Sequence, residues 1–396
     1  MIAITGIGVI SPLGRGTHAF LEGLMSRRSP LAPLLNTGLN FETPPVVAQV
    51  VDPLEVEDHP GFRFSRTDKM AILAARDAVA SAGLHARLAD CGVVASTTVG
   101  GLPDLPLDIV KDPRGYYRNG GFAKATAYPN SHPADAVSAV LGLNGPRFGV
   151  SVACASGSMA IALAARMVMS GAAPLMLAGG AEALCHLTMC GFNGLQALDP
   201  APCRPFDKNR RGLNLGEGAA FLMIENLSHA RARGARVYAA LRGWAMTNDA
   251  FHLTAPHDRG AGVAASIAGA LKMANAVPDD IGYVNAHGTA TPLNDVAEVK
   301  GYESLFAARR HSIPVSSTKS YFGHCLAAAG ALEAVVTILS INSSTLFPTL
   351  RLADPIASHA IDWISDGPRH QDIPLAISVS AGFGGSNTSL VFGREA

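Results

Sequence analysis

The sequence of 396 residues contains little charge and no excess of either sign. Charged side chains make up 16% of it, with 31 lysines and arginines against 31 aspartates and glutamates. Proteins that bind nucleic acid usually carry a basic excess, so this class is not indicated. Any charged partner must be met by a local patch rather than by the net charge.

Cysteine is also scarce, with six in the chain and no CxxC pair. No cysteines and histidines have zinc-binding spacing, so we expect neither a disulfide framework nor a metal site. Free thiols in a reducing compartment, here the cytoplasm, are the default for such a chain. The motifs GxxxxGK[ST], HExxH and GxSxG are absent, which argues against P-loop, zinc-protease and α/β-hydrolase chemistry.

Long hydrophobic runs are missing as well, although 48% of the residues are hydrophobic. Apolar stretches fall short of about 18 residues or are interrupted by proline, glycine and serine. The first residues, MIAITGIGVISPLG, lack the basic region of a signal peptide. We therefore expect no membrane span.

What the sequence does contain is an alternation of short apolar runs with helical patterns. This alternation is typical of an α/β protein with largely buried sheets. Strands are predicted at 2–10, 92–97, 147–153, 174–181, 219–225, 237–246, 281–287, 313–318, 374–383 and 388–392. Helices are predicted at 68–84, 159–171, 262–276 and 326–342. The region 101–130 has weak periodicity, and we interpret it as an excursion from the core.

Two stretches share one layout of a strand, a turn with chemically active residues and an Ala-rich helix. They are RFGVSVACASGSMAIALAARMV, from residue 147, and IPVSSTKSYFGHCLAAAGALEAVVTIL, from residue 313. The pair predicts two similar halves that divide near 226–234. The alternative is that any α/β protein offers such pairs.

Cys154 lies in the first of these turns, between a strand and a helix. The first N–H groups of a helix are unpaired and its dipole is positive there, so the position would lower the pKa of the thiol. The alternative is a small buried hydrophobic residue, the commonest role of a free cysteine.

His287 ends a predicted strand in the stretch NAHGTATPLNDVAE, residues 285–298. Thr289 and Thr291 follow and share one face of an extended segment. Asp295 and Glu298 stand three residues apart at the start of a helix. The alternative is a histidine that only packs at the end of the strand.

The second turn holds Lys319 and His324, and Glu333 follows on an otherwise apolar helix. A carboxylate in apolar surroundings needs a cation, and Lys319 could supply it. Surface charges are the alternative for both residues. Near the end of the sequence, Gly382, Gly384 and Gly385 surround Phe383, which is either a movable plug or a core residue of a tight hairpin.

Together these pieces resemble the β-ketoacyl-[acyl-carrier-protein] synthases of the elongating Cys-His-His type, within the thiolase superfamily. The motifs stand in the family's order: TGIGVISPLG, GPRFGVSVACASG, RPFDKNRRGLNLGEGAA, NAHGTATPLND, STKSYFGHCLAAAGALE and GFGGSNTSLVF. The resemblance implies a five-layered αβαβα fold with two pseudo-symmetric halves, residues 1–230 and 231–396. It implies decarboxylative condensation of malonyl-carrier with an acyl chain, which grows by two carbons.

The resemblance also implies catalytic roles. Cys154 would carry the acyl chain as a thioester. His287 and His324 would point at the carbonyl of the malonyl thioester. Lys319 and Glu333 would support the site, with Lys319 holding the environment of His324.

Binding roles follow in the same way. The backbone N–H groups of Cys154 and Phe383 would form the oxyanion hole, and Phe383 would gate access to the thiol. Thr289 and Thr291 would hydrogen-bond the phosphopantetheine arm of the carrier. Phe192 falls where the family places an aromatic residue of the acyl pocket. No tightly bound cofactor is implied.

The implied partner is an acidic acyl carrier protein, which a neutral enzyme would meet with a basic patch. Two segments supply candidate cations, and solvated loops are the alternative. The candidates are Arg63, Arg66, Lys69, Arg204, Lys208, Arg210 and Arg211. A homodimer is implied, or a heterodimer with a related ketosynthase-like chain.

One residue departs from the family pattern: Asn294 precedes Asp295, where many members have glycine. The pathway stays open between primary fatty acids and a specialised polyketide or polyene system. The alternatives are a ketosynthase partner in a heterodimeric system and a non-elongating thiolase-like acyltransferase. A non-catalytic chain-length partner would lack the active cysteine, and a degradative thiolase would need a second cysteine near the C-terminus.

Overall fold

The computed structural model describes residues 1–34, 43–84, 88–104, 112–116 and 126–395. Its main feature is a 12-stranded sheet made of two five-stranded halves with additions. The N-terminal half has the order β6 (Arg147–Val150), β5 (Cys91–Ser96), β7 (Leu175–Glu182), β9 (Gly218–Asn226) and β1 (Ile2–Ser11). The C-terminal half has the order β12 (Ile313–Ser316), β11 (Ile281–Asn285), β16 (Leu375–Gly382), β17 (Ser386–Gly393) and β10 (Ala239–Asn248).

The two halves repeat one topology. In each, the first three strands in this order are parallel, and the last two add antiparallel. The halves meet where β1 pairs antiparallel with β10, through Ile2–Ile4. The predicted duplication is therefore confirmed at the level of strand order and direction.

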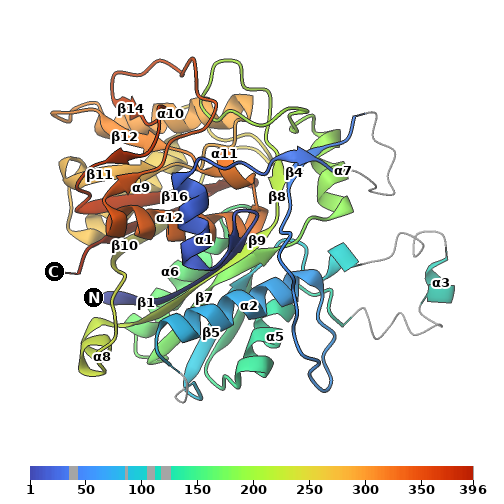
Figure 1. Cartoon of the computed structure of the whole chain (residues 1–396). Coiled ribbons are helices and arrows are strands. Elements are labelled where there is room, and N and C mark those ends of the chain that lie inside the picture. Colours follow the sequence, from blue (N-terminus) through green and yellow to red (C-terminus); the bar gives the residue numbers. More distant parts are fainter. Residues whose placement is uncertain (35–42, 85–87, 105–111, 117–125, 396) are drawn as a thin grey trace.

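Helices complete five layers. The helices α2 (Arg66–Ser81) and α5 (His132–Leu141) pack on the outer face of the N-terminal half, at the bottom of Figure 1. The helices α9 (Ala261–Ala274) and α10 (Pro292–Phe306) cover the outer face of the C-terminal half. Between the halves lie α6 (Ser156–Met169) and α12 (Ala329–Ser343), which contact strands of both.

Small residues let the two central helices approach closely. A Cβ atom on Gly157 would stand 2.7 Å from the Ala327 carbonyl oxygen, and one on Gly330 would stand 2.4 Å from Ser158 Oγ. The segment Leu326–Ser343 is apolar and long enough to cross a membrane, but 89% of it is buried inside the protein. Its hydrophobicity is that of a helix enclosed between two sheets.

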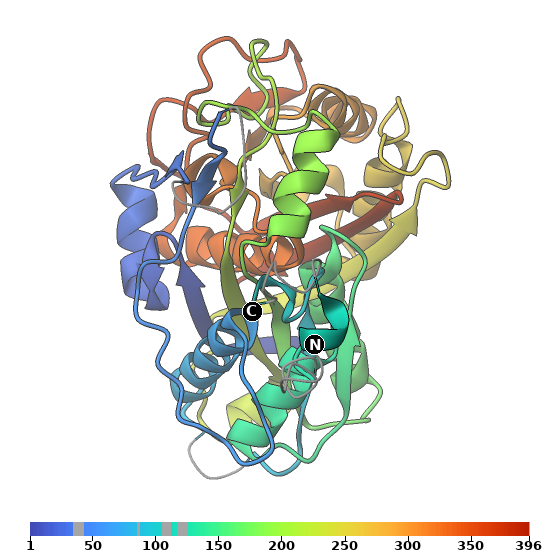
Figure 2. The same cartoon turned by 90° about the vertical axis from the view of Figure 1, so that its right-hand side faces the viewer.

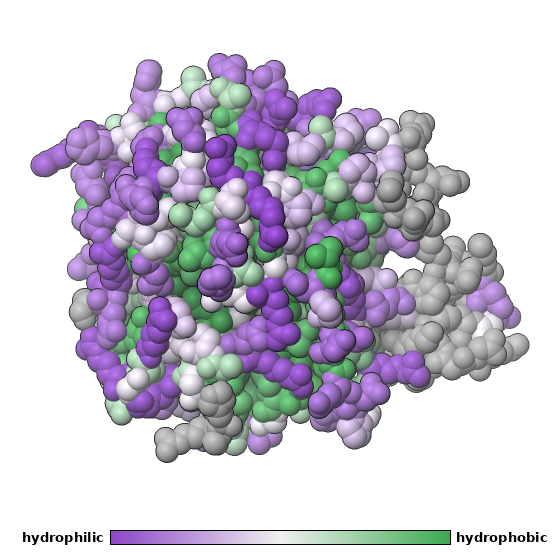
Figure 3. Space-filling view, viewed as in Figure 1, coloured by the Kyte–Doolittle hydropathy of each residue, from purple (hydrophilic) through white to green (hydrophobic). Residues whose placement is uncertain are grey.

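All ten predicted strands and all four predicted helices are confirmed. Three strands end two or three residues earlier than predicted, at Val150, Asn285 and Ser316, so that the chemically active residues lie after them. The predicted excursion at 101–130 falls largely outside the described residues. Hydrophobic side chains on the surface seen in Figure 3 form scattered groups between hydrophilic ones.

The remaining elements are short or peripheral. The helices are α1 (Gly16–Met25), α3 (Pro113–Tyr116), α7 (His186–Gly194), α8 (Leu227–Ala232), α11 (Lys319–Phe322) and the 3-10 turns Leu102–Asp104, Pro278–Asp280 and Leu326–Ala328. The strands are β2 (Gly14–Arg15), β3 (Ala32–Pro33), β4 (Val46–Ala48), β8 (Leu215–Gly216), β13 (Thr345–Leu346), β14 (Ile361–Trp363) and β15 (Arg369–His370). Of these, α7 bears on the site, and it faces the viewer in Figure 2.

Candidate active site

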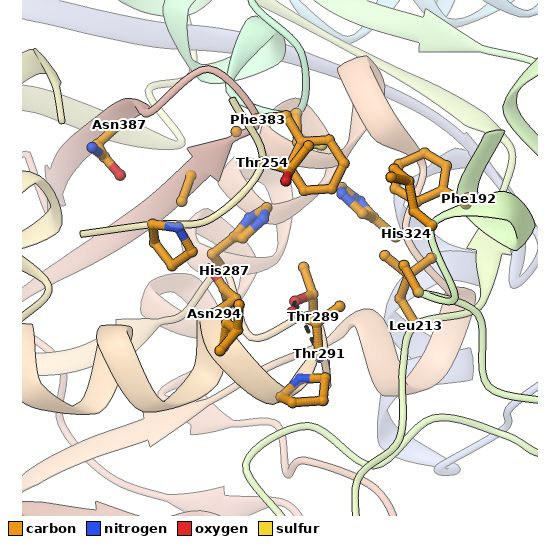
Figure 4. Close-up of a pocket in the computed structure, with 18 of the residues that line it drawn as sticks. Phe192, Leu213, Thr254, His287, Thr289, Thr291, Asn294, His324, Phe383 and Asn387 are labelled. Atoms are coloured by element: carbon orange, nitrogen blue, oxygen red, sulfur yellow. Dashed lines mark hydrogen bonds between the residues drawn. The ribbon is translucent and has the colours of Figure 1, made fainter. Parts of the chain in front are cut away.

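The turns after three strands and one hairpin tip meet at a single cavity of about 330 Å³. Cys154 follows β6, His287 follows β11 and His324 follows β12, while Phe383 lies between β16 and β17. The carboxyl ends of parallel strands are where α/β proteins place their ligand sites. Figure 4 shows both histidines with Phe383 and Phe192 around this cavity.

The turn that holds Cys154 is strained and braced. Ala153 has a φ of +51°, a region that favours glycine. The Ser156 hydroxyl accepts a hydrogen bond from the Val152 N–H at 2.7 Å and donates one to the Ala153 carbonyl. Gly382 fits against this turn, since a Cβ there would stand 3.1 Å from the Cys154 nitrogen. The hairpin tip is thereby held against the thiol.

The expectation of a lowered thiol pKa is wrong. Burial raises the pKa of Cys154 to about 12, with Glu182 and Glu333 acting in the same direction. The nearby charge of Lys319 and the Phe383 N–H lower it, but by less than burial raises it. In a buried site the thiolate loses more stabilisation by desolvation than it gains from the nearby cation and the backbone N–H. The resting nucleophile is therefore a thiol.

This state predicts how the thiol reacts with iodoacetamide. The rate at Cys154 should rise with pH through pH 9 without a plateau, because only the thiolate reacts and its fraction keeps growing. Peptide mass spectrometry resolves Cys154 from the exposed Cys190, which serves as an internal comparison. A plateau of the Cys154 rate near pH 7 would show an activated thiolate and contradict this assignment.

Lys319 hydrogen-bonds His287, and its charge acts on His324 as well. Its ammonium donates to His287 Nδ1 at 3.2 Å and to the His287 carbonyl oxygen at 2.7 Å. It also forms an ion pair with Glu333, and both side chains are buried. The predicted partnership of lysine and glutamate is confirmed. Because Nδ1 of His287 faces a donor, its proton lies on Nε2.

Both histidines are neutral. Burial and the charge of Lys319 hold the pKa of His287 well below 6.5, and His324 lowers it further. The same two causes lower the pKa of His324. The rings lie 5.3 Å apart between centroids and nearly perpendicular, at 84°. Two neutral imidazoles can thus face one substrate without burying two cations.

The two threonines share one face, as predicted. Their hydroxyl oxygens are 2.9 Å apart, and both residues line the cavity. Between them, Ala290 has a φ of +69°, and its N–H donates to the Asp295 carboxylate at 3.1 Å. Arg210 fixes the end of this segment by donating to the Thr291 carbonyl at 3.2 Å.

The aromatic residues lie on the other side of the cavity. The ring of Phe192, on α7, stacks on Phe383 with centroids 5.6 Å apart and planes at 27°. Phe383 is 36% exposed, so it is not the core residue of a closed hairpin. The plug interpretation fits this position better.

Two further residues that line the cavity, Asp249 and Asn387, were not predicted from the sequence. Asn387 donates to the Asp249 carboxylate at 2.9 Å, and the Asp249 N–H donates to the Gly385 carbonyl at 2.8 Å. These bonds tie the loop after β10 to the hairpin tip. Asp249 directly follows β10 and Asn387 is the second residue of β17, so a polar residue at a strand end is the only sequence signal of either. Among the described residues no cluster of His, Cys, Asp or Glu could hold a metal ion.

Comparison with protein families decides the identity. A model described as "Beta-ketoacyl synthase, N-terminal domain" matches residues 1–230, and "Beta-ketoacyl synthase, C-terminal domain" matches residues 238–353. The chain belongs to the β-ketoacyl synthase family. The 3-oxoacyl-[acyl-carrier-protein] synthase 2 of Vibrio harveyi is 36% identical over 100% of this chain and 99% of its own length.

Solved structures agree with this family membership. The ishigamide ketosynthase/chain length factor matches with a TM-score of 0.89 and 29% identity, over 100% of this chain and 99% of that one. A type II polyketide ketosynthase, solved with its acyl-carrier protein, matches with a TM-score of 0.86 and 28% identity over the same shares. The chain therefore has the thiolase-like fold of the ketosynthases.

The predicted carrier patch of this β-ketoacyl synthase contains one residue that is nearly buried, Arg210, and one, Arg66, that is half-buried in an ion pair with Glu217. Arg66 donates to both carboxylate oxygens of Glu217, at 2.6 and 3.0 Å, and to the Val50 carbonyl. Arg210 is only 8% exposed and serves the threonine segment. The structural role of Arg210 was not recognisable from the sequence, because it stands in the basic run KNRR. The cations that keep exposed surface are Arg63, Arg66, Lys69, Arg204, Lys208 and Arg211.

Proposed function

We propose that this β-ketoacyl synthase joins an acyl group on Cys154 to malonyl-[acyl-carrier-protein] with loss of carbon dioxide. The observation that supports it most is the meeting of one thiol and two neutral histidines at one cavity. A nucleophile next to uncharged donors suits a reaction with a covalent intermediate and an enolate. The threonine pair is positioned for the phosphopantetheine arm, the only prosthetic group required.

In the first half-reaction the sulfur of Cys154 attacks the acyl thioester of the carrier. A new C–S bond forms, the carrier C–S bond breaks, and the thiol proton ends on the departing carrier thiol. Since the thiol rests protonated, its proton leaves only as the attack proceeds. The N–H groups of Phe383 and Cys154 would hold the transient oxyanion, and that of Phe383 already donates to the sulfur.

In the second half-reaction malonyl-carrier loses carbon dioxide and becomes an enolate. His287 and His324 donate from Nε2 to its oxygen, and Lys319 keeps His287 in the tautomer that can donate. The enolate carbon then attacks the acyl group, the C–C bond forms and the bond to Cys154 breaks. Water returns a proton to the released thiolate.

A second ketosynthase chain completes the assembly in this proposal. The strand β6, which leads to Cys154, is an edge strand paired only with β5 among the described strands, and Phe148 on it is 46% exposed. An uncovered edge is a template for pairing with another chain. A homodimer is our first choice. The ishigamide ketosynthase/chain length factor supports a heterodimer as the alternative.

Three further proposals concern the surroundings of the site. The acidic carrier protein would meet the cations with exposed surface, Arg63, Arg66, Lys69, Arg204, Lys208 and Arg211. We place the division of the chain near residue 230, supported by the ends of the family models and by the junction between β9 and β10. The cytoplasm is the proposed compartment, in keeping with six unpaired cysteines.

A panel of acyl donors tests the function and narrows the pathway. Acyl carriers of increasing length, saturated and polyunsaturated, are offered with malonyl carrier, and 3-oxoacyl products are measured by mass spectrometry. We expect products two carbons longer than the donor, with kcat/KM falling sharply outside one range of lengths. A preference for saturated donors would indicate primary fatty-acid synthesis. A preference for polyunsaturated donors would indicate a specialised polyketide or polyene pathway. No product from any donor would overturn the proposal.

A further inference from the structure

Asn294, which directly precedes the buried Asp295, occupies a defined place in the cavity wall. It is the third residue of α10 and lines the cavity together with Thr289 and Thr291. Figure 4 shows it on the same wall as His287. Neither half-reaction described above uses its side chain.

The amide of Asn294 touches two buried carboxylates. Its Nδ2 donates to Asp295 Oδ1 and to Glu298 Oε2, each at 3.2 Å. Both carboxylates hold the segment after β11: Glu298 accepts the His287 N–H at 2.7 Å and the Gly288 N–H at 2.8 Å. One amide therefore links Glu298, which holds the His287 N–H, to Asp295, which holds the Ala290 N–H.

These contacts fix which way the amide points. Carboxylate oxygens that already receive backbone N–H groups act as acceptors, so the NH₂ side must face them. The oxygen Oδ1 is consequently on the opposite side, and no residue of the described parts of the chain donates to it. A carbonyl oxygen with free lone pairs thus stands at the cavity wall beside the threonine pair.

We propose that Asn294 is a substrate-binding residue whose Oδ1 accepts a hydrogen bond from an amide N–H of the pantetheine arm. The arm contains two secondary amides, each with one N–H to satisfy when the arm enters a narrow cavity. The threonine hydroxyls bond to each other, whereas the oxygen of Asn294 is an acceptor fixed by the two bonds that its NH₂ group makes. The inference rests on the proposed function, because it needs a pantetheine thioester as substrate.

The test compares natural and altered arms within each enzyme variant. The probes are malonyl-pantetheine and two analogues, each with one amide N–H replaced by an ester oxygen. The acyl-loaded protein is used, and kcat/KM of condensation is measured for the wild type and Asn294→Ala. For one analogue we expect kcat/KM of the wild type to be about 10-fold lower than with malonyl-pantetheine. With Asn294→Ala the same analogue should lower kcat/KM by less than 2-fold, because this variant has no Oδ1 to accept a bond from that N–H.

The ratio of kcat/KM for an analogue to kcat/KM for malonyl-pantetheine is taken within each variant. A substitution that lowers activity with all probes equally leaves this ratio unchanged. Asn144→Ala, in an exposed turn, is the matched control and should keep the wild-type ratio. If Asn294→Ala does not fold, Asn294→Ser is used in its place. The serine hydroxyl can still donate a hydrogen bond to Asp295, but serine lacks the amide oxygen under test. Equal sensitivity of wild type and variant to both analogues would overturn the inference. A wild type that does not turn over malonyl-carrier at all would overturn the proposed function instead.

Discussion

Replacing Cys154 by alanine is expected to abolish uptake of the acyl group and to lower condensation by roughly 10⁴-fold or more. The thiol is the nucleophile that the cavity presents, between the histidines and the Phe383 N–H. Removing it leaves the donors for the enolate in place, so slow decarboxylation of malonyl carrier should persist. Intact-protein mass after incubation with acyl carrier measures the uptake, and product formation measures the condensation.

The matched control is Cys190→Ala. Cys190 is exposed on α7 and does not line the cavity, so this variant should take up acyl groups as the wild type does. Acylation that survives in Cys154→Ala, or disappears in Cys190→Ala, would show that the nucleophile has been misassigned.

Replacing His287 or His324 by alanine should lower decarboxylation of malonyl carrier by roughly 10²–10³-fold, the cost of losing one preorganised donor to a developing oxyanion. Acylation of Cys154 should fall by less than about 10-fold, because backbone N–H groups serve that step. Release of carbon dioxide from the preloaded acyl-enzyme measures the first rate, and quenched-flow mass spectrometry the second.

The exposed His311 provides the control for these variants, since its side chain lies away from the cavity. His311→Ala should leave both rates within 2-fold of the wild type. A histidine variant of the site that loses acylation while decarboxylation stays normal would contradict the division of roles. If both rates fall and the melting temperature is lowered as well, the imidazole stabilises the fold and the assigned catalytic role is wrong.

The location of the reacting groups was predictable from the sequence, because they follow predicted strands. Apolar runs mark β6, β11 and β12. Cys154 and His287 stand in the turns after β6 and β11, and His324 follows β12 after the short helix α11. Parallel strands in one sheet bring such turns to one edge, so the cavity follows from the strand pattern.

The pairing within the site was not predictable in the same way. Lys319, at the start of α11, contacts His287, which follows β11. This contact between residues far apart in the sequence depends on the three-dimensional packing of the two segments. The high pKa of the Cys154 thiol depends on how tightly the cavity closes, which local sequence does not encode.

The helix α10 shows why the extent of some elements escaped prediction, since only its start, at Asp295 and Glu298, was expected. Its buried face includes Asp295, Glu298 and Gly301, so apolar residues do not recur with the helical period. Those carboxylates are buried because they hold the backbone around His287. Where a functional segment needs buried polar support, the hydrophobic pattern that reveals a helix is weakened.

A single-turnover chase tests the central claim most directly. The protein is loaded with an acyl carrier, its peptides are mapped by mass spectrometry, and malonyl carrier is then added. The account predicts one acyl group per chain on Cys154, which leaves on addition of malonyl carrier as a 3-oxoacyl product two carbons longer. An acyl group on another residue, or one that stays on Cys154 during the chase, would contradict it.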